Sequence, residues 1–238
     1  AISLTLASED ATYEDVASKF FEHFVYIGEA VNRVDGQPGG RSDGLWDEAR
    51  GYYFDALVLA DGRRIAVDAF TIAGVIPLFA IAVADKEVFA AFREFSERYG
   101  WFAENRPELL GNLADMTHIG VHDRMRLALV DSHKLARILE HVLDERRMLS
   151  DHGVRSVSRE HAAQPFKLTL GGQTFLLDYE PAESTSGLFG GNSNWRGPVW
   201  FPLNFLLIEA LQKHHYFLGD AFRLRDPSGS GPECSLWD

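Results

Sequence analysis

Apolar residues recur every three or four positions between residues 13 and 34. The repeating positions are Val16, Phe20, Phe21, Phe24, Ile27, Ala30 and Val31. This period places the side chains on one stripe of a helix, and Glu14 and Asp15 suit its first turn. The pattern therefore predicts a helix over residues 13–34.

Two other segments follow a period of two. Residues 45–63 alternate toward a turn at Asp61-Gly62, and residues 166–179 alternate around Gly171-Gly172. Alternation that ends in a glycine turn is typical of a β-hairpin. The sequence therefore predicts two small hairpins.

Helical patterns return in four further segments. They cover residues 70–84, 87–101, 131–148 and 202–216. Helices joined by long glycine-rich loops favour a mainly α fold, either an α-solenoid or an α/α toroid, with the hairpins as insertions. We find no repeat of fixed period, which argues against the commoner repeat arrays.

Charge and cysteine content narrow the classes of partner. The 238 residues hold 23 Lys and Arg against 35 Asp and Glu, a net charge of −12. Such a surface repels phosphate backbones, so nucleic acid is not an expected partner. The most apolar stretch, residues 69–84, falls short of the roughly 20 residues that span a bilayer, so no membrane association is expected. Cys234 is the only cysteine, which excludes an internal disulfide and fits a cytoplasmic location.

Residues 183–200 hold the richest mixture of candidate binding groups. Glycines, amides, one arginine and two tryptophans occur together there. Flat aromatic rings suit the apolar rims of sugars, while Asn194, Arg196 and carboxylates suit sugar hydroxyls. The alternative interpretation is a loop that caps the core, with Trp195 and Trp200 packed beneath it.

Carboxylates gather near both predicted hairpins. They are Asp47, Glu48, Asp55, Asp178, Glu180 and Glu183. Glycoside hydrolysis typically uses one carboxylic acid to protonate the leaving oxygen and one carboxylate on the other face of the sugar. Any pair is a candidate, and the alternative for each residue is a solvated charge on a strand or loop.

Other chemistries find no matching motif. The nine histidines form no His-Glu-x-x-His zinc motif, so no metal is expected. A serine nucleophile elbow, a phosphate loop and a dinucleotide fingerprint are also missing from the sequence, so no cofactor is expected.

The segment over residues 190–211 resembles glycoside hydrolase family 63, especially its long bacterial members related to mannosyl-oligosaccharide glucosidase. The resemblance rests on Trp-Arg-Gly-Pro-Val-Trp at positions 195–200. Supporting matches are Phe-Phe-Glu-His-Phe at 20–24, Gly-Leu-Trp-Asp-Glu at 44–48, Gly-Tyr-Tyr-Phe-Asp at 51–55, Gly-Val-Ile-Pro-Leu-Phe-Ala at 74–80, Gly-Val-Arg-Ser-Val-Ser at 153–158 and Tyr-Glu-Pro-Ala-Glu at 179–183. The matches extend over nearly the whole chain.

The resemblance implies a fold and an activity. It implies part of an (α/α)6 toroid that hydrolyses α-glucosidic or related α-linked sugars with inversion, with carboxyls roughly 6.5 to 9.5 Å apart. Asn194, Trp195, Arg196 and Trp200 would bind an oligosaccharide or small glycoside.

The sequence also departs from the family pattern. The family's acid segment precedes Ala1 and its base segment follows Asp238, so residues 1–238 are expected to be one incomplete segment of a larger catalytic domain. Ala69 and Phe70 replace a basic-polar pair of the family. The rival hypothesis is a non-catalytic helical carbohydrate-binding or scaffolding module. In a third hypothesis, Asp47 or Glu183 supplies a catalytic carboxylate in a rearranged site.

Overall fold

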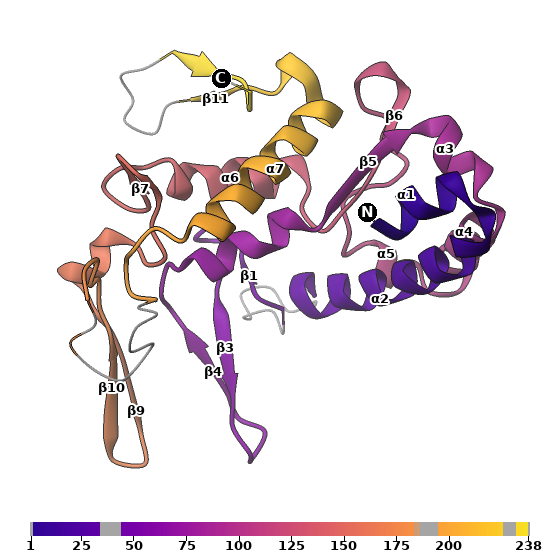
Figure 1. Ribbon diagram of the computed structural model, residues 1–238. Helices are drawn as coiled ribbons and strands as arrows, with labels where there is room; N and C mark the ends of the chain where they lie inside the picture. Colours follow the sequence, from indigo (N-terminus) through magenta and orange to yellow (C-terminus); the bar gives the residue numbers. More distant parts are fainter. Residues whose placement is uncertain (1, 34–43, 184, 186–194, 226–231, 238) are drawn as a thin grey trace.

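The computed structural model describes residues 2–33, 44–183, 185, 195–225 and 232–237. Its α-helices are α1 (Ile2–Glu9), α2 (Glu14–Asn32), α3 (Lys86–Ala91), α4 (Arg93–Asn105), α5 (Pro107–Leu110), α6 (Ser132–Val142) and α7 (Phe201–Leu218). Short 3-10 helices are η1 (Ala11–Tyr13), η2 (Ile72–Phe79), η3 (Val121–Asp123), η4 (Arg159–Ala162) and η5 (Gly219–Ala221). Figure 1 follows them along the chain.

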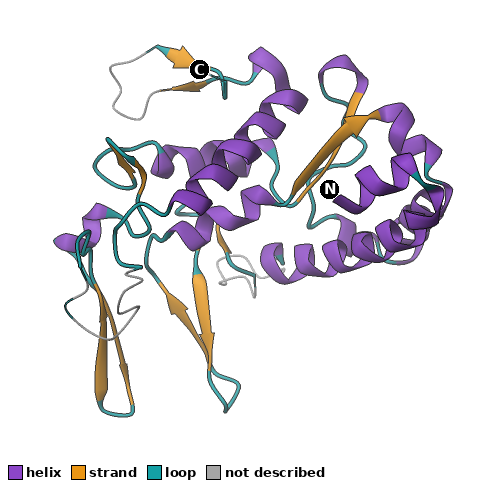
Figure 2. Cartoon of the chain, in the orientation of Figure 1, coloured by secondary structure: helices purple, strands orange, loops and turns teal. Residues whose placement is uncertain are grey.

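The strands form separate antiparallel pairs. These are β1 (Trp46–Asp47) with β2 (Tyr52–Tyr53), β3 (Asp55–Val58) with β4 (Arg64–Val67), β5 (Ile81–Asp85) with β6 (Arg124–Ala128), β7 (Leu149–Ser150) with β8 (Gly153–Val154), β9 (Phe166–Leu170) with β10 (Gln173–Leu177), and β11 (Leu224–Arg225) with β12 (Glu233–Cys234). Figure 2 shows the β5–β6 pair between helices, whereas the β3–β4 and β9–β10 hairpins extend away from them. Because strands of this kind recur through the described residues, the class is mixed α and β, and the expected mainly α toroid segment is wrong.

The largest local error concerns residues 70–84. The expected helix is instead η2 followed by β5. Pro77 lies inside η2 and has no N–H to continue a hydrogen-bonded helix. Residues 81–85 then pair with β6, where Ile81 lies opposite Ala128. The backbone of this apolar run is therefore hydrogen-bonded to a strand that lies about 40 positions further along the chain.

The expected helix over residues 87–101 is also divided. Phe92 has extended backbone angles (φ −86°, ψ 96°) and separates α3 from α4. The ring of Phe92 is buried in the core together with Phe89 and Phe95. The break therefore allows side chains from both short helices to reach the same core.

Two other local predictions are confirmed, whereas the helix expected over residues 131–148 ends at Val142 and the hairpin expected over residues 45–63 is replaced by two strand pairs, β1–β2 and β3–β4. Helix α2 occupies all but the ends of the expected range, and β9 and β10 meet at Gly171 and Gly172, whose φ angles are +56° and +81°. Positive φ favours glycine, which explains why this turn is readable from the sequence.

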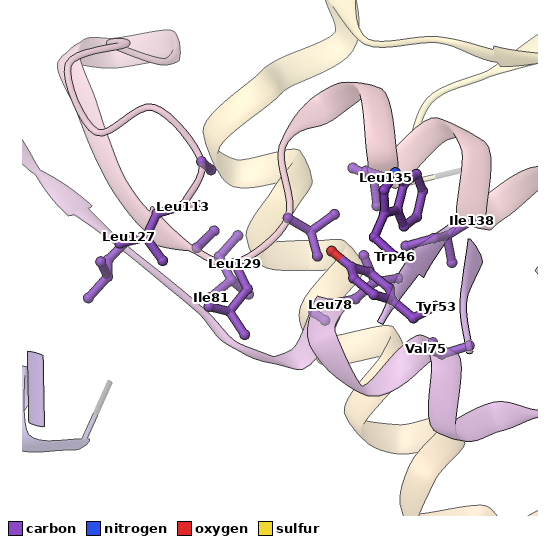
Figure 3. Close-up of a cluster of buried hydrophobic side chains, with 14 of the residues drawn as sticks. Trp46, Tyr53, Val75, Leu78, Ile81, Leu113, Leu127, Leu129, Leu135 and Ile138 are labelled. Carbon is purple, nitrogen blue, oxygen red and sulfur yellow. The ribbon is translucent and has the colours of Figure 1, made fainter. Parts of the chain in front are cut away.

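The main core joins segments that are distant in the chain. Figure 3 shows Trp46 and Tyr53 lying beside Leu135 and Ile138 of α6, with Val75 close by. The Trp46 and Tyr53 ring centroids are 4.9 Å apart. This packing fixes the first hairpin against α6.

A buried polar cluster lies at the end of α2. The Asn32 Nδ2 atom donates to the carbonyls of Asn112 and Leu129, each at 2.8 Å. Its Oδ1 atom accepts from Tyr53 Oη at 2.6 Å and Lys134 Nζ at 2.9 Å. One amide side chain therefore connects four separate parts of the chain.

No helix within the described ranges has the length and apolar character to cross a bilayer.

Candidate functional site

Trp195 and Trp200 stack against one another in the segment that precedes α7 in the chain. Their rings stack with centroids 4.0 Å apart and planes 17° apart, and Trp195 is 44% exposed. A sugar held between two rings would need about 7 Å, or two van der Waals contacts. The pair therefore presents an outer aromatic face and does not form a two-sided clamp.

Arg196 points into the protein and not toward the exposed aromatic face. Its side chain is buried, and Nη1 donates to Asp178 Oδ1 at 3.1 Å. The other terminal nitrogen contacts the Glu180 carboxylate, and the Glu180 N–H donates to the Arg196 carbonyl. Arg196 therefore fastens the tryptophan segment to the chain after β10, and the expectation that it contacts sugar finds no support in this geometry.

Gly197 allows the segment to pass close to Tyr179. Its φ is +150°, and a Cβ atom built there would lie 2.8 Å from the Tyr179 ring. The Gly197 N–H donates to the hydroxyl of buried Ser156 at 2.8 Å. The backbone of Val199 then forms an antiparallel bridge with Arg155. Glycine is required here by both backbone angle and space.

A cavity of about 470 Å³ opens beside this segment. Gly197, Pro198 and Val199 belong to its wall. The polar side chains around it are Glu145, Ser150, Asp151, His152, Arg155, Arg159 and Tyr179. Its volume falls within the range of small-molecule sites, and its donors and acceptors suit a ligand rich in hydroxyls.

Arg155 and Tyr179 fix one another in the cavity wall. Arg155 Nε donates to Tyr179 Oη at 3.1 Å, and a second guanidinium nitrogen contacts the Leu149 carbonyl. Arg159, by contrast, is exposed at the cavity and forms no ion pair with any residue in the described ranges. The wall therefore combines one anchored guanidinium with one that faces solvent.

The cavity carboxylates are not those selected from the sequence. Glu145 follows α6, and Asp151 lies in the turn between β7 and β8. Neither belongs to a hairpin with strong alternation, so the sequence offers no direct signal for them. The nearest signal is the family-like segment at 153–158, which begins two residues after Asp151.

Asp47 closes the turn between β1 and β2. Its carboxylate accepts from the Arg50 backbone N–H at 2.9 Å and from Arg50 Nε and Nη2 at 2.9 and 2.8 Å. Asp68 also accepts from Arg50 at 3.0 Å. These contacts account for Asp47 as a structural residue and give no support for a catalytic role.

The remaining sequence candidates lie elsewhere. Glu183 is exposed, two residues after Pro181 in the cavity wall, and no contact between described atoms joins it to Asp47. Asn194 lies outside the described residues. The described part of the chain also contains no group of three or more metal-ligating side chains placed to hold an ion.

Phe70, which departs from the family pattern, belongs to an aromatic cluster. Its ring centroid lies 5.1 Å from that of Tyr52 and 4.8 Å from that of His141. Burial lowers the pKa of His141, whose Nε2 lies 2.7 Å from the Arg50 carbonyl. This position therefore packs the core beside the first hairpin.

One relative emerges from comparison with known proteins. The uncharacterized protein YMR196W of Saccharomyces cerevisiae is 40% identical over 243 residues, which cover 99% of this chain and 22% of the yeast protein. The chain thus spans about a fifth of that relative's length. No protein-family model matches the chain.

Proposed function

We propose that this chain forms a sugar-binding part of an inverting α-glycosidase that hydrolyses α-glucosidic or related α-linked sugars. The observation that carries the proposal is the anchored tryptophan segment. Buried Arg196 holds it, Trp195 keeps an exposed face, and Gly197, two residues further along the chain, lines a polar cavity. The resemblance to glycoside hydrolase family 63 rests on the same segment.

In this proposal the exposed Trp195 ring packs against the apolar face of a sugar unit. Such contacts use aromatic area and C–H groups, so they tolerate rotation of the sugar better than a hydrogen bond does. Tyr179 and Arg159 donate hydrogen bonds to sugar oxygens, while Asp151 and Glu145 accept them from hydroxyls. The stacked ring pair provides a flat aromatic surface for this contact.

The catalytic acid and base remain unassigned among the described residues. The family resemblance implies that both come from segments outside residues 1–238, with the cavity side chains positioning the substrate. The proposed location is the cytoplasm, because Cys234 is a free thiol.

The second candidate function is a non-catalytic carbohydrate-binding or scaffolding module. The ion pair of Asp47 with Arg50 and the separate position of Glu183 argue against a rearranged catalytic site within this chain, and they are compatible with such a module. Both candidate functions use the exposed Trp195 surface to bind sugar, but only the glycosidase hydrolyses the bound sugar.

Binding is tested by titrating the protein with α-linked gluco-oligosaccharides while following tryptophan fluorescence. We expect Trp195→Ala to weaken binding about tenfold, or ~1.4 kcal/mol. Trp101→Ala is the matched control, because Trp101 is 47% exposed, as Trp195 is at 44%, but lies on α4 and not in the tryptophan segment. Equal affinity of the Trp195 variant and the wild type would refute the sugar-binding surface.

Turnover is tested separately by proton NMR of the products of the longest natural polypeptide that contains this sequence. An inverting enzyme releases the β-anomer first from an α-linked substrate. Binding without any hydrolysis of the panel would favour the module, and an α-anomer formed first would contradict inversion.

A further inference from the structure

One side of α7 exposes a row of large apolar side chains. Phe201, Phe205 and Ile208 are 81%, 55% and 56% exposed, and their spacing of four and three residues places them on one helix face. The buried residues Leu207 and Ala210 face the core. The first half of α7 is therefore apolar on its open side as well as on its packed side.

A solvated helix face normally carries polar or charged residues. Between Phe201 and Ile208, however, α7 has no charged residue, and Glu209 is the first. Helices that are apolar all round occur in the interior of large proteins. Contiguous exposed apolar surface otherwise marks an interaction site. The composition of α7 therefore suits a helix that is covered on both sides.

Helix α2 repeats this arrangement. Phe21 and Val25 are buried, while Val16, Phe20 and Ile27 are exposed along the other side. Their spacing of four and seven again defines one face. Two helices thus each bury one apolar face and expose a second.

The yeast relative shows that a sequence of this kind can be part of a much longer polypeptide. It carries a sequence 40% identical to nearly all of this chain as only 22% of its length, so in that protein the same kind of fold has much additional polypeptide attached. We propose that the Phe201–Phe205–Ile208 face of α7 is an internal interface, covered by an apolar segment of the same polypeptide that lies outside residues 1–238. This interface is independent of sugar binding.

The chemistry of the face defines the covering segment. An aliphatic and aromatic surface without charge matches a segment whose contact positions are also apolar, because a charge buried there would have no partner. Side chains spaced by three and four on α7 fit the grooves of another helix. The expected occupant is therefore an amphipathic helix with uncharged contact positions.

The test is thiol labelling in the longest natural polypeptide that contains this sequence. Ile208→Cys is introduced, and alkylation at that position is followed by peptide-resolved mass spectrometry under native conditions. Gln173→Cys is the control, because Gln173 is a polar, exposed residue at the β9–β10 turn. Phe201→Cys provides a second position at the start of the helix, in case the Ile208 variant does not fold.

Protection of the helix face is the expected result. We expect the thiol of the Ile208→Cys variant to react about 100-fold more slowly than that of the control, since labelling then requires local opening. Labelling at the control rate at both α7 positions would overturn the proposal. Protection that disappears on dilution would also overturn it, because it would indicate a second copy or a separate partner.

Discussion

Arg196 and Asp178 are joined by a 3.1 Å hydrogen bond between Nη1 and Oδ1, which connects the chain after β10 to the segment before α7. Arg196 is buried, while Asp178 is partly open to solvent. Arg196, the second residue of the Trp-Arg-Gly-Pro-Val-Trp segment, thus points inward and helps to position Trp195 and Trp200.

Replacement of Arg196 should destabilise the fold. Arg196→Met leaves the carboxylates of Asp178 and Glu180 without their cation, and we expect a loss of about 3 kcal/mol in the free energy of unfolding. Urea denaturation measures this loss. Arg93→Met removes an exposed ion pair with Glu97 and should change stability by less than about 0.5 kcal/mol. Similar values for the two variants would contradict the anchoring role.

Gly197→Ala should also be destabilising. The added methyl group meets the Tyr179 ring at 2.8 Å, at a backbone angle that L residues rarely adopt. We expect a loss of about 2 kcal/mol in thermal or urea unfolding. The control is Gly100→Ala on α4, where no atom lies within 4 Å of the added Cβ. Since alanine favours helix, this control should gain about 0.5 to 1 kcal/mol.

The Asn32 cluster predicts a graded response. Tyr53→Phe removes one donor while Lys134 still binds Oδ1, so we expect a loss of about 1 kcal/mol. Asn32→Ala leaves two carbonyls, a hydroxyl and an ammonium without this partner, and the loss should reach about 3 kcal/mol. Equal losses in urea denaturation would show that the cluster does not act as described.

His214 predicts a dependence of stability on pH. The side chain is fully buried, and burial together with the nearby Arg126 lowers its pKa to about 3. An unfolded histidine has a pKa near 6.5, so below that value the unfolded state binds more protons than the folded state. Stability should therefore fall as pH decreases from 6.5 toward 3, by up to about 1.4 kcal/mol per pH unit.

The measurement compares the wild type with His214→Leu by urea denaturation at several pH values. The variant should show a shallower loss between pH 6.5 and 4. Near pH 8, His214 is almost entirely neutral in both states, so measurements there control for the effect of the substitution on packing. Parallel pH profiles for the two proteins would rule out the contribution of His214.

Elements governed by neighbouring residues were predictable from the sequence. The apolar stripe of α2 and the paired glycines of the β9–β10 turn give local signals that need no distant partner. The same stripe did not reveal which face is buried, because Phe20 and Phe21 are equally apolar in the sequence, yet only Phe21 reaches the core. Burial depends on what packs against the helix.

The candidate site was predictable only in part. The segment at 195–200 was identified from its residues, but its sugar contacts stay a prediction. Arg196 points inward because Asp178 and Glu180 bind its guanidinium. Asp151 lines the cavity because the β7–β8 turn lies near Val199 and its neighbours. None of these relations has a fixed spacing in the chain.

By itself, the sequence determined the acidic charge, helix α2, the glycine turns and the tryptophan segment, because each follows from composition or from residues within a few positions. Tertiary structure decided the secondary structure of residues 81–85. They form a strand paired with β6, although their apolar run suits a helix equally well. It also decided that Arg196 points inward and anchors the tryptophan segment to Asp178 and Glu180. Both outcomes depend on partners far away in the chain, whose hydrogen bonds and charges are brought close only when the core forms.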